Sequence, residues 1–460
     1  MSEHTTTECL LFPDIFDRPV VAKFDQQQGS SDGGAVLLKA ADRRLGLTAA
    51  LAACLHDQRQ SGKVRHELHE LLTQRIMAIA CGYEDANDAA RLACDPIHKL
   101  LVGRDPLKGE DLASQPTLSR FENAPDRKEL FRMTEALADR VIERHRQRLH
   151  GRARRITIDL DPTDDPTHGQ QQFTFFNTHY DGYCYLPVVA FLTFDQEPEQ
   201  YLVAAVLRPG NVSGSCGAVG ILSRLIRRLV EAFPKVVVRV RLDGGFAAPE
   251  VLDFLDAQPR LEYVVNMASN KVLKRLVEPA MRTARRLSKE SGKTEHIYGA
   301  FPYKTKKTWK STRRLLYKAE VTRHPNRDPK DNPRFVVTNM KQSPQWLYEE
   351  VYCQRGDLEN RIKELHYGME IGRTSCSDFW ANQFRVLLTA AAYVLMQELR
   401  LRLARTNSAR VQVTTLRERF LKIGVQVVTS LRRIVLHLPR AFPFRATFSH
   451  LALSLGAQTG

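Results

Sequence analysis

Apolar residues recur at helical spacing through the first third of the chain. Segments such as LLKAADRRLGLTAALAACL and ELHELLTQRIMAIACGY place them at positions i, i+3, i+4 and i+7 of an amphipathic helix. The alternation that is typical of strands does not occur there. The pattern predicts a helical domain over residues 34–150, preceded by a flexible amino-terminal segment, 1–33, that contains most of the turn-rich string QQQGSSDGG.

The period of the pattern changes near residue 154. The string RRITIDLD alternates, so that Ile156, Ile158 and Leu160 share one face while Asp159 and Asp161 share the other. Strand-like segments follow at 184–194, 201–210, 235–243 and 261–267, and helical segments at 217–233 and 249–257. This β-β-β-α-β-α-β order predicts a mixed α/β sheet with helices packed on it over residues 151–268.

The rest of the chain divides into three further regions. Residues 269–342 form a basic insertion with β character, because RLLYKAEV and RFVVTNM are strand-like. Residues 343–402 return to a helical pattern, and we assign them to the same core as residues 151–268. A basic carboxy-terminal region, 403–460, follows.

Positive charge is concentrated in two places. The 460 residues have a formal net charge of +16, yet residues 271–318 alone carry 15 Lys and Arg against three acids. Residues 400–460 carry 11 Lys and Arg against one acid. Two such regions on an otherwise mildly acidic chain indicate a polyanionic partner such as nucleic acid, although a solvated surface is the alternative for any charged run.

The first basic region interleaves cations with aromatic residues in HIYGAFPYKTKKTWK. Its lysines are candidates for phosphate contacts, and Tyr303 or Trp309 could stack on a base or fill a groove. The candidate DNA-binding lysines are Lys304, Lys306, Lys307 and Lys310.

Other features argue against secreted and membrane proteins. The sequence contains no run of about 18 apolar residues, so it predicts no membrane span. The acidic start MSEHTTTECLLFPD is unlike a secretory signal. The eight cysteines are scattered without a C-x-x-C pair, which argues against a disulfide framework or a zinc module. We therefore expect a cytoplasmic protein.

Carboxylates at two strand ends are candidates for metal binding. Asp159 and Asp161 end the first strand, and Asp243 ends the fourth, directly before Gly244 and Gly245. If these two strands are neighbours, their carboxylates converge, and the repulsion between them is tolerable when a divalent cation lies there. Two Mg²⁺ ions about 4 Å apart would activate a water and stabilise the leaving oxygen of a phosphodiester, which requires a third carboxylate.

The helical segment VYCQRGDLENRIKEL supplies that third carboxylate. Tyr352, Arg355, Glu359 and Lys363 share one stripe at spacings of three and four residues. The alternative interpretation is a ladder of ion pairs on a solvated surface.

The motifs in combination resemble those of a known family. The run Y-x-x-R-x-x-x-E resembles the Tyr-Arg-Glu-Lys signature of bacterial insertion-sequence DDE transposases, which have a ribonuclease-H-like core. D-x-T at Asp161–Thr163 and LDGGF at 242–246 resemble the family's first two motifs. The strings SQPTLSRFEN, DPTHG, YCQRGDLENRIKEL and GRTSC are similar to those of insertion-sequence family thirteen-eighty. The resemblance covers roughly residues 30–400.

The resemblance implies roles for particular residues. Asp161, Asp243 and Glu359 would be the catalytic triad that binds two Mg²⁺ ions, or Mn²⁺. Tyr352 and Arg355 would contact the transposon end. The signature lysine falls on His366, with Lys363 and Lys341 as substitutes. Asp159 remains the rival of Asp161, and we expect Asp164 and Asp165 to cap a turn or to be solvated.

The resemblance also implies a function. We expect a transposase that binds the terminal inverted repeats of an insertion sequence and catalyses metal-dependent cleavage and strand transfer. Its partners would be double-stranded DNA of the element ends and the target, and a second copy of the chain on paired ends. The expected location is the bacterial cytoplasm, associated with the nucleoid.

The helical domain 34–150 is the candidate for reading DNA sequence, because Ser114–Glu122 resembles the start of a helix-turn-helix recognition helix. A capped surface helix is the alternative. Two other functions remain open. One is a structure-selective nuclease on the same core, and the other is a DNA-binding regulator without catalysis.

Overall fold

A computed structural model describes residues 9–459, which divide into two compact units. The first unit combines residues up to Arg44 with Gln60–Ser119 and the chain from Glu398 onward. The second unit consists of Leu45–Arg59 and Arg120–Gln397. None of the described helices is both long and apolar enough to cross a membrane.

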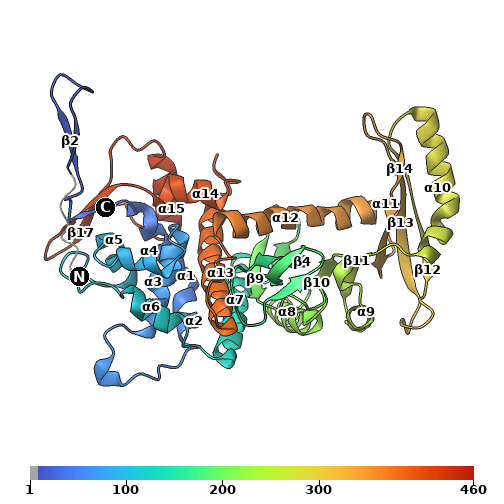
Figure 1. Ribbon diagram of the computed structural model, residues 1–460, viewed down its shortest axis with the longest axis horizontal. Helices are drawn as coiled ribbons and strands as arrows, with labels where there is room; N and C mark the ends of the chain where they lie inside the picture. Colours follow the sequence, from blue (N-terminus) through green and yellow to red (C-terminus); the bar gives the residue numbers. More distant parts are fainter. Residues whose placement is uncertain (1–8, 460) are drawn as a thin grey trace. The chain divides into compact units, whose positions relative to one another are not determined.

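A nine-stranded mixed sheet organises the second unit (Figure 1). Its order is β12-β13-β15-β11-β10-β4-β8-β9, with β14 paired to β13. The strands are β4 Arg155–Pro162, β8 Val188–Phe194, β9 Tyr201–Val206, β10 Val237–Leu242, β11 Leu261–Met267, β12 Glu295–Tyr303, β13 Arg313–Thr322, β14 Lys330–Asp331 and β15 Arg334–Thr338.

The centre of this sheet meets the condition under which the carboxylates at the ends of the first and fourth strands converge. The first predicted strand, β4, pairs in parallel with the fourth, β10, and β10 pairs in parallel with β11. Strand β8 is antiparallel to both β4 and β9. β4 and β10 are buried along nearly their whole length, because helices cover the sheet and leave few positions for solvated side chains.

The helices of the second unit agree with the helical patterns of the sequence. They include α2 Leu47–Ala52, α7 Arg127–Arg148, α8 Ala218–Ala232 and α9 Pro249–Asp256. A long helix, α13 Phe379–Arg402, ends in the first unit. A small sheet, β5 Asp165–Pro166, β7 Gly182–Tyr185 and β6 Phe175–Asn177, follows β4.

The basic insertion differs from its prediction in two ways. Its strands extend the central sheet, because β15 pairs with β11 and β13 pairs with β15. It also contains a 21-residue helix, α10 Lys271–Ser291, where we predicted only β character. α10 buries an apolar stripe that includes Leu273, Val277 and Met281, while its other faces are highly charged and contain Pro279. Charge and proline obscured its helical period.

The first unit is mainly helical, and the predicted helical region 34–150 is divided between the two units, because Leu45–Arg59 and the residues from Arg120 onward belong to the second. The first unit contains α1 Val36–Leu45, α3 Leu68–Ala80, α4 Ala86–Arg91, α5 Pro96–Val102, α14 Val413–Leu416 and α15 Arg445–Ser454. Helix α6, Gln115–Glu122, begins here. A sheet of β3 Gly29–Ser30, β16 Val425–Thr429 and β17 Ile434–His437 joins residues near the two ends of the chain.

The segment predicted as flexible, 1–33, contains strands that we did not predict. β1 Cys9–Phe12 and β2 Val20–Lys23 form a hairpin, and β3 pairs with β16. Residues 1–8 lie outside the described part of the chain.

Candidate active site

Asp161 and Asp243 lie at the same edge of the central sheet. The β4–β10 register places Arg241 opposite Asp159 and Leu242 opposite Leu160, so each aspartate directly follows this paired segment. Parallel neighbouring strands end at one edge, which brings their terminal side chains together. The turn after Asp243 is held in place, because the Gly245 N–H donates to Oδ1 of Asp243 at 3.0 Å.

Gly245 and Gly214 leave little room for a side chain beside Asp243. A Cβ atom on Gly245 would lie 3.2 Å from Oδ1 of Asp243, and one on Gly214 would lie 3.2 Å from the carbonyl oxygen of Gly245. Such contacts are tighter than a side chain normally makes. These two glycines thus allow a close approach of two loops beside Asp243.

The segment that carries Tyr352, Arg355 and Glu359 is helical but irregular. It runs through α11 Pro344–Trp346, a π-helical stretch Leu347–Tyr352, a 3₁₀ turn Cys353–Arg355, α12 Gly356–Lys363 and a second π-helical stretch Glu364–Gly368. π-Helical turns are rare and frequently lie at functional sites. The predicted stripe therefore lies between two local distortions of the helix.

This helical segment is anchored to the sheet beside the two aspartates. Nη1 of Arg241 donates to the carbonyl oxygen of Val351 at 3.2 Å. Nη2 of Arg355 lies 2.5 Å from Oδ1 of Asp161, and both side chains are largely buried. Arg355 therefore faces the carboxylates.

The charges of the candidate triad act on one another. Burial raises the pKa of Asp161 to about 7, Arg355 opposes this rise, and the charges of Asp243 and Glu359 add to it. Three acids that interact in this way would be stabilised by a cation. Oxygen ligands of this kind fit Mg²⁺ or Mn²⁺.

Asp159, the rival of Asp161, has a different environment. It is 0% exposed and accepts hydrogen bonds from Nε and Nη2 of Arg241 at 2.7 and 2.6 Å. Nε2 of Gln200 donates a third at 3.0 Å. This carboxylate is thus fully engaged in a buried ion pair, which favours Asp161 as the reactive member of the strand.

Asp165 corrects our expectation of a solvated or capping side chain. It is 1% exposed, and the Thr374 hydroxyl donates to its Oδ2 at 2.7 Å. Burial raises its pKa to about 7. A Cβ atom on Gly372 would lie 3.0 Å from Oδ1. The motifs DPTHG and GRTSC, far apart in sequence, therefore lie against each other.

His366 occupies the position of the signature lysine and lies near the first motif. Its Nε2 is 2.8 Å from Oγ1 of Thr163, and burial lowers the pKa of the imidazole. Lys363 and Lys341, the proposed substitutes, are both exposed. The histidine thus links the helical segment to the D-x-T motif.

Tyr180 is a residue that the sequence did not single out. It lies in the loop between β6 and β7, where burial and the charges of Asp164, Asp161 and Asp243 raise the pKa of its phenol to about 12. Tyr352 also lies near Asp243, and burial raises its pKa. Tyr180 lies in a four-residue loop, 178–181, and no motif of the sequence pointed to it.

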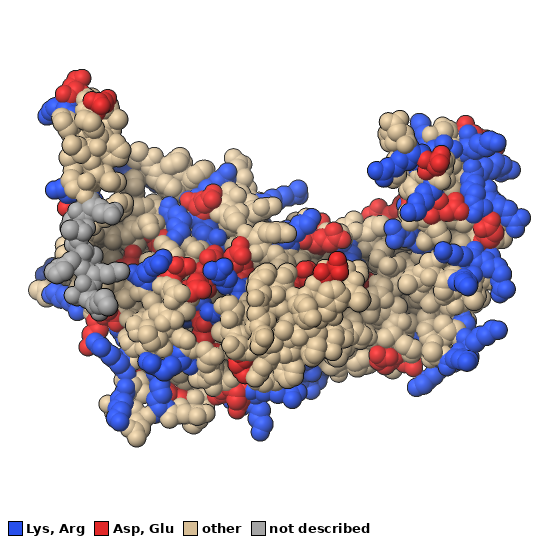
Figure 2. Space-filling model, in the orientation of Figure 1, with Lys and Arg blue, Asp and Glu red and all other residues tan. Residues whose placement is uncertain are grey.

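The basic insertion exposes its lysines but not its aromatic residues. Lys304, Lys306, Lys307 and Lys310 are exposed, and Nζ of Lys310 lies 3.5 Å from Asp253. Lys and Arg gather around α10 and the neighbouring strands (Figure 2). Tyr303 and Trp309 are 8% and 5% exposed, and their rings pack edge to face. The expectation that either stacks on a base is therefore wrong for this conformation.

Two other features of the described residues do not match phosphoryl transfer. Among the described residues, one group of three His, Cys, Asp or Glu side chains has its candidate ligand atoms all within 4.8 Å of one another, and it consists of Asp32, Cys81 and His98. The carboxylates of the triad Asp161, Asp243 and Glu359 are therefore more widely spaced than this. Lys422 already pairs with Asp32 at 2.8 Å, and its cation argues against a metal there. Wider spacing is compatible with ligands shared between two ions.

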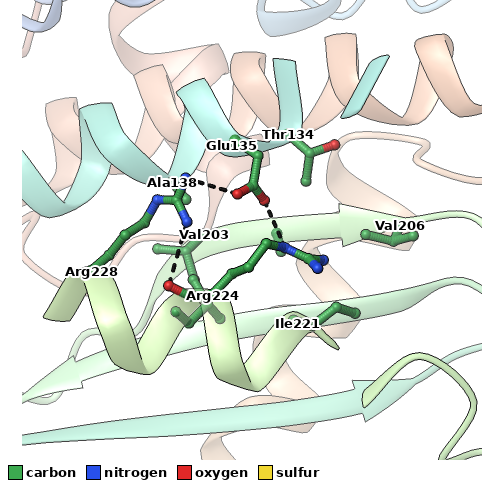
Figure 3. A pocket seen from close by; sticks show the side chains of 10 residues that line it. Thr134, Glu135, Ala138, Val203, Val206, Ile221, Arg224 and Arg228 are labelled. Carbon is green, nitrogen blue, oxygen red and sulfur yellow. Dashed lines mark hydrogen bonds and ion pairs between the residues drawn. The ribbon is translucent and has the colours of Figure 1, made fainter. Parts of the chain in front are cut away.

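A hollow between α7, α8 and β9 lies among packing residues (Figure 3). Its acid, Glu135, is bound by Nε of Arg224 at 3.1 Å and by Nη2 of Arg228 at 2.8 Å. Its charged groups are therefore engaged with one another.

Comparison with known proteins identifies the family. The family model described as transposase DDE domain group 1 matches residues 12–458, which is nearly the whole chain. No curated protein sequence matches the chain. From the match over nearly all of its length, the chain belongs to the DDE transposase family.

Proposed function

We propose that this transposase cuts DNA at the ends of its own insertion sequence and joins the freed ends to target DNA, with Asp161, Asp243 and Glu359 as its metal-binding triad. The observation that carries the proposal is the parallel pairing of β4 and β10, which puts Asp161 and Asp243 at one sheet edge. Arg355 approaches the same edge from the helical segment. The sheet with β4 at its centre would be the ribonuclease-H-like core.

The chain's own groups have separate roles in this proposal. Two Mg²⁺ or Mn²⁺ ions bound by the triad would activate the attacking oxygen and stabilise the leaving oxygen. Arg355 would bind a phosphate next to the scissile bond. Its Nε is buried and has no hydrogen-bond acceptor among the described residues, so it is available to a ligand. Tyr352 would contact the same strand of DNA.

The basic insertion would supply affinity that does not depend on sequence. Lysines 304, 306 and 307 are exposed cations that can neutralise backbone phosphates. Helix α6 would contribute to sequence reading, since its residues at 114–122 carry the recognition-helix resemblance. A dimer in the bacterial cytoplasm would hold the two ends of the element together while both are cut.

An excision assay tests the proposal. The substrate is a supercoiled plasmid that carries the coding sequence with its own genomic flanks. We expect double-strand cuts at both flanks with Mg²⁺ and none with EDTA. Asp243→Asn and Glu359→Gln should abolish the cuts and retain binding of the flanks. Asp357→Asn is the matched control, because Asp357 is an exposed acid on the same helix.

Other results would favour the two alternatives. Cuts at junctions or single-stranded regions, independent of the flanks, would indicate a structure-selective nuclease. Flank binding without cutting under any metal would indicate a regulator.

A further inference from the structure

The amino-terminal hairpin exposes an unusual amount of apolar surface. Eight large apolar side chains between residues 10 and 24 are exposed by 39–85%, with Phe24, Ile15 and Phe16 the most exposed. β1 and β2 form a sheet of two strands, and the described residues add no third strand to it. Such an isolated hairpin is marginally stable in water, so an apolar one needs a partner surface.

Both faces of the hairpin are apolar. The register pairs Phe12 with Val20 on one face and Leu11 with Val21 on the other. Of the eight strand residues, Lys23 is the only charged one. Strand edges of soluble proteins usually carry charges or prolines that prevent pairing with another chain. Lys23, at the end of β2, is the one such residue in these strands.

The chemistry of the hairpin argues against DNA and lipid as partners. Residues 9–25 contain three acids and two bases, so their net charge is slightly negative and does not attract phosphates. The connecting turn contains Asp14, Asp17 and Arg18, which would be costly to insert into a bilayer. A protein surface fits both the apolar faces and the charged turn.

The exposed area agrees with a dimer. Five of the eight side chains are aliphatic, so roughly 150 Å² each, about half exposed, offers about 600 Å² per chain; two chains together reach about 1,200 Å², the lower end of the range for stable interfaces. Two hairpins related by a twofold axis present identical edges, and antiparallel pairing of identical strands satisfies such symmetry. We propose that this hairpin is the contact through which two copies of the chain associate.

The proposed function includes a dimer on paired DNA ends; the new element is the place of the contact, which does not depend on DNA cleavage. Sedimentation velocity of the full chain, without DNA, measures it. We expect Leu10→Ser/Leu11→Ser to raise the dimer dissociation constant at least tenfold, because each change occurs twice in a symmetric interface. Leu276→Ser/Leu453→Ser is the matched control, since those leucines are exposed by 44% and 46% on other elements.

A cross-linking experiment locates the contact independently. The photo-reactive analogue benzoylphenylalanine at position 16 is introduced into a mixture of ¹⁴N- and ¹⁵N-labelled chains. Mass spectrometry should find mixed-isotope cross-links between position 16 and residues 9–24 of the other copy. A monomer at all concentrations, a dimer unaffected by the hairpin change, or cross-links only within one chain would overturn the proposal. Excision activity is scored separately, so failure here leaves the proposed chemistry open to its own test.

Discussion

Two aspartates on one strand should respond oppositely to the same substitution. Asp159 and Asp161 share a face of β4, and each pairs with a largely buried arginine. Asp159 also accepts a hydrogen bond from Gln200, whereas burial and the charges of Asp243 and Glu359 raise the pKa of Asp161 despite Arg355. We predict that Asp159→Asn destabilises the folded chain and that Asp161→Asn does not. Asparagine has nearly the same shape as aspartate, so the comparison isolates charge.

The expected magnitudes follow from the two environments. Removing one partner of a buried ion pair costs about 3–5 kcal/mol, because the remaining charge loses its compensation. Asp161 has a folded pKa of about 7 against an ordinary value of 3.8. At about 1.4 kcal/mol per unit, its ionisation destabilises the metal-free fold by at most about 4 kcal/mol above pH 7. The pKa of about 7 already includes the attraction to Arg355, so that attraction is not subtracted again.

The sign of the pH dependence provides a further check. The folded state holds the Asp161 proton more tightly than the unfolded state does, so this group lowers stability as pH rises from about 4 to about 7. The advantage of Asp161→Asn should therefore appear at pH 8 and vanish at pH 4.

Thermal unfolding in EDTA at these two pH values measures both effects. At pH 8 we expect the Tm of Asp159→Asn to fall by at least about 6 °C, using about 2–4 °C per kcal/mol, and that of Asp161→Asn to stay level or rise. Equal losses of Tm for the two variants would refute the distinction between a structural and a reactive aspartate.

Three further predictions concern DNA and metal binding. Arg355→Ala should reduce cutting at the element flanks at least about 100-fold while changing the affinity for unrelated duplex less than threefold, because Arg355 faces Asp161; equal losses would deny it a positional role. Neutralising the four lysines between 304 and 310 should lower the salt slope of duplex binding by about 3, since Lys310 is partly engaged by Asp253; an unchanged slope would place the DNA elsewhere. Mn²⁺ affinity, measured by calorimetry, should be about tenfold weaker at pH 6 than at pH 8, because a proton competes for Asp161 with its pKa of about 7; a flat profile would contradict that competition.

Much of the sheet could be predicted from the sequence. Alternation in RRITIDLD and the short apolar runs after it gave the strands, and β11 begins and ends at the predicted residues. The sequence allowed β4 and β10 to be neighbours without requiring it, and the structure shows that they pair in parallel. Helix α10 was not predicted, because its narrow stripe of buried apolar residues is surrounded by charged residues that hide the helical period.

The environments of single side chains could not be predicted. Asp159 and Asp161 are equivalent in pattern, and only Arg241, which lies 82 residues from Asp159, distinguishes them. Trp309 belonged to a lysine-rich string that looked solvated, yet Arg313 lies over its ring at 4.8 Å. The bond between Asp165 and Thr374 spans 209 residues. Such contacts depend on the tertiary fold, which local periodicity does not encode.

The central claim is that three acids distant in sequence hold divalent ions at one place. Fe²⁺ substituted for Mg²⁺ in the full chain, with ascorbate and peroxide, generates hydroxyl radicals that cut the backbone next to the bound metal. We predict cuts beside Asp161, Asp243 and Glu359, which excess Mg²⁺ suppresses and Asp243→Asn abolishes. Cuts confined to the surroundings of Asp32 and His98, or no cuts that Mg²⁺ suppresses, would contradict the account.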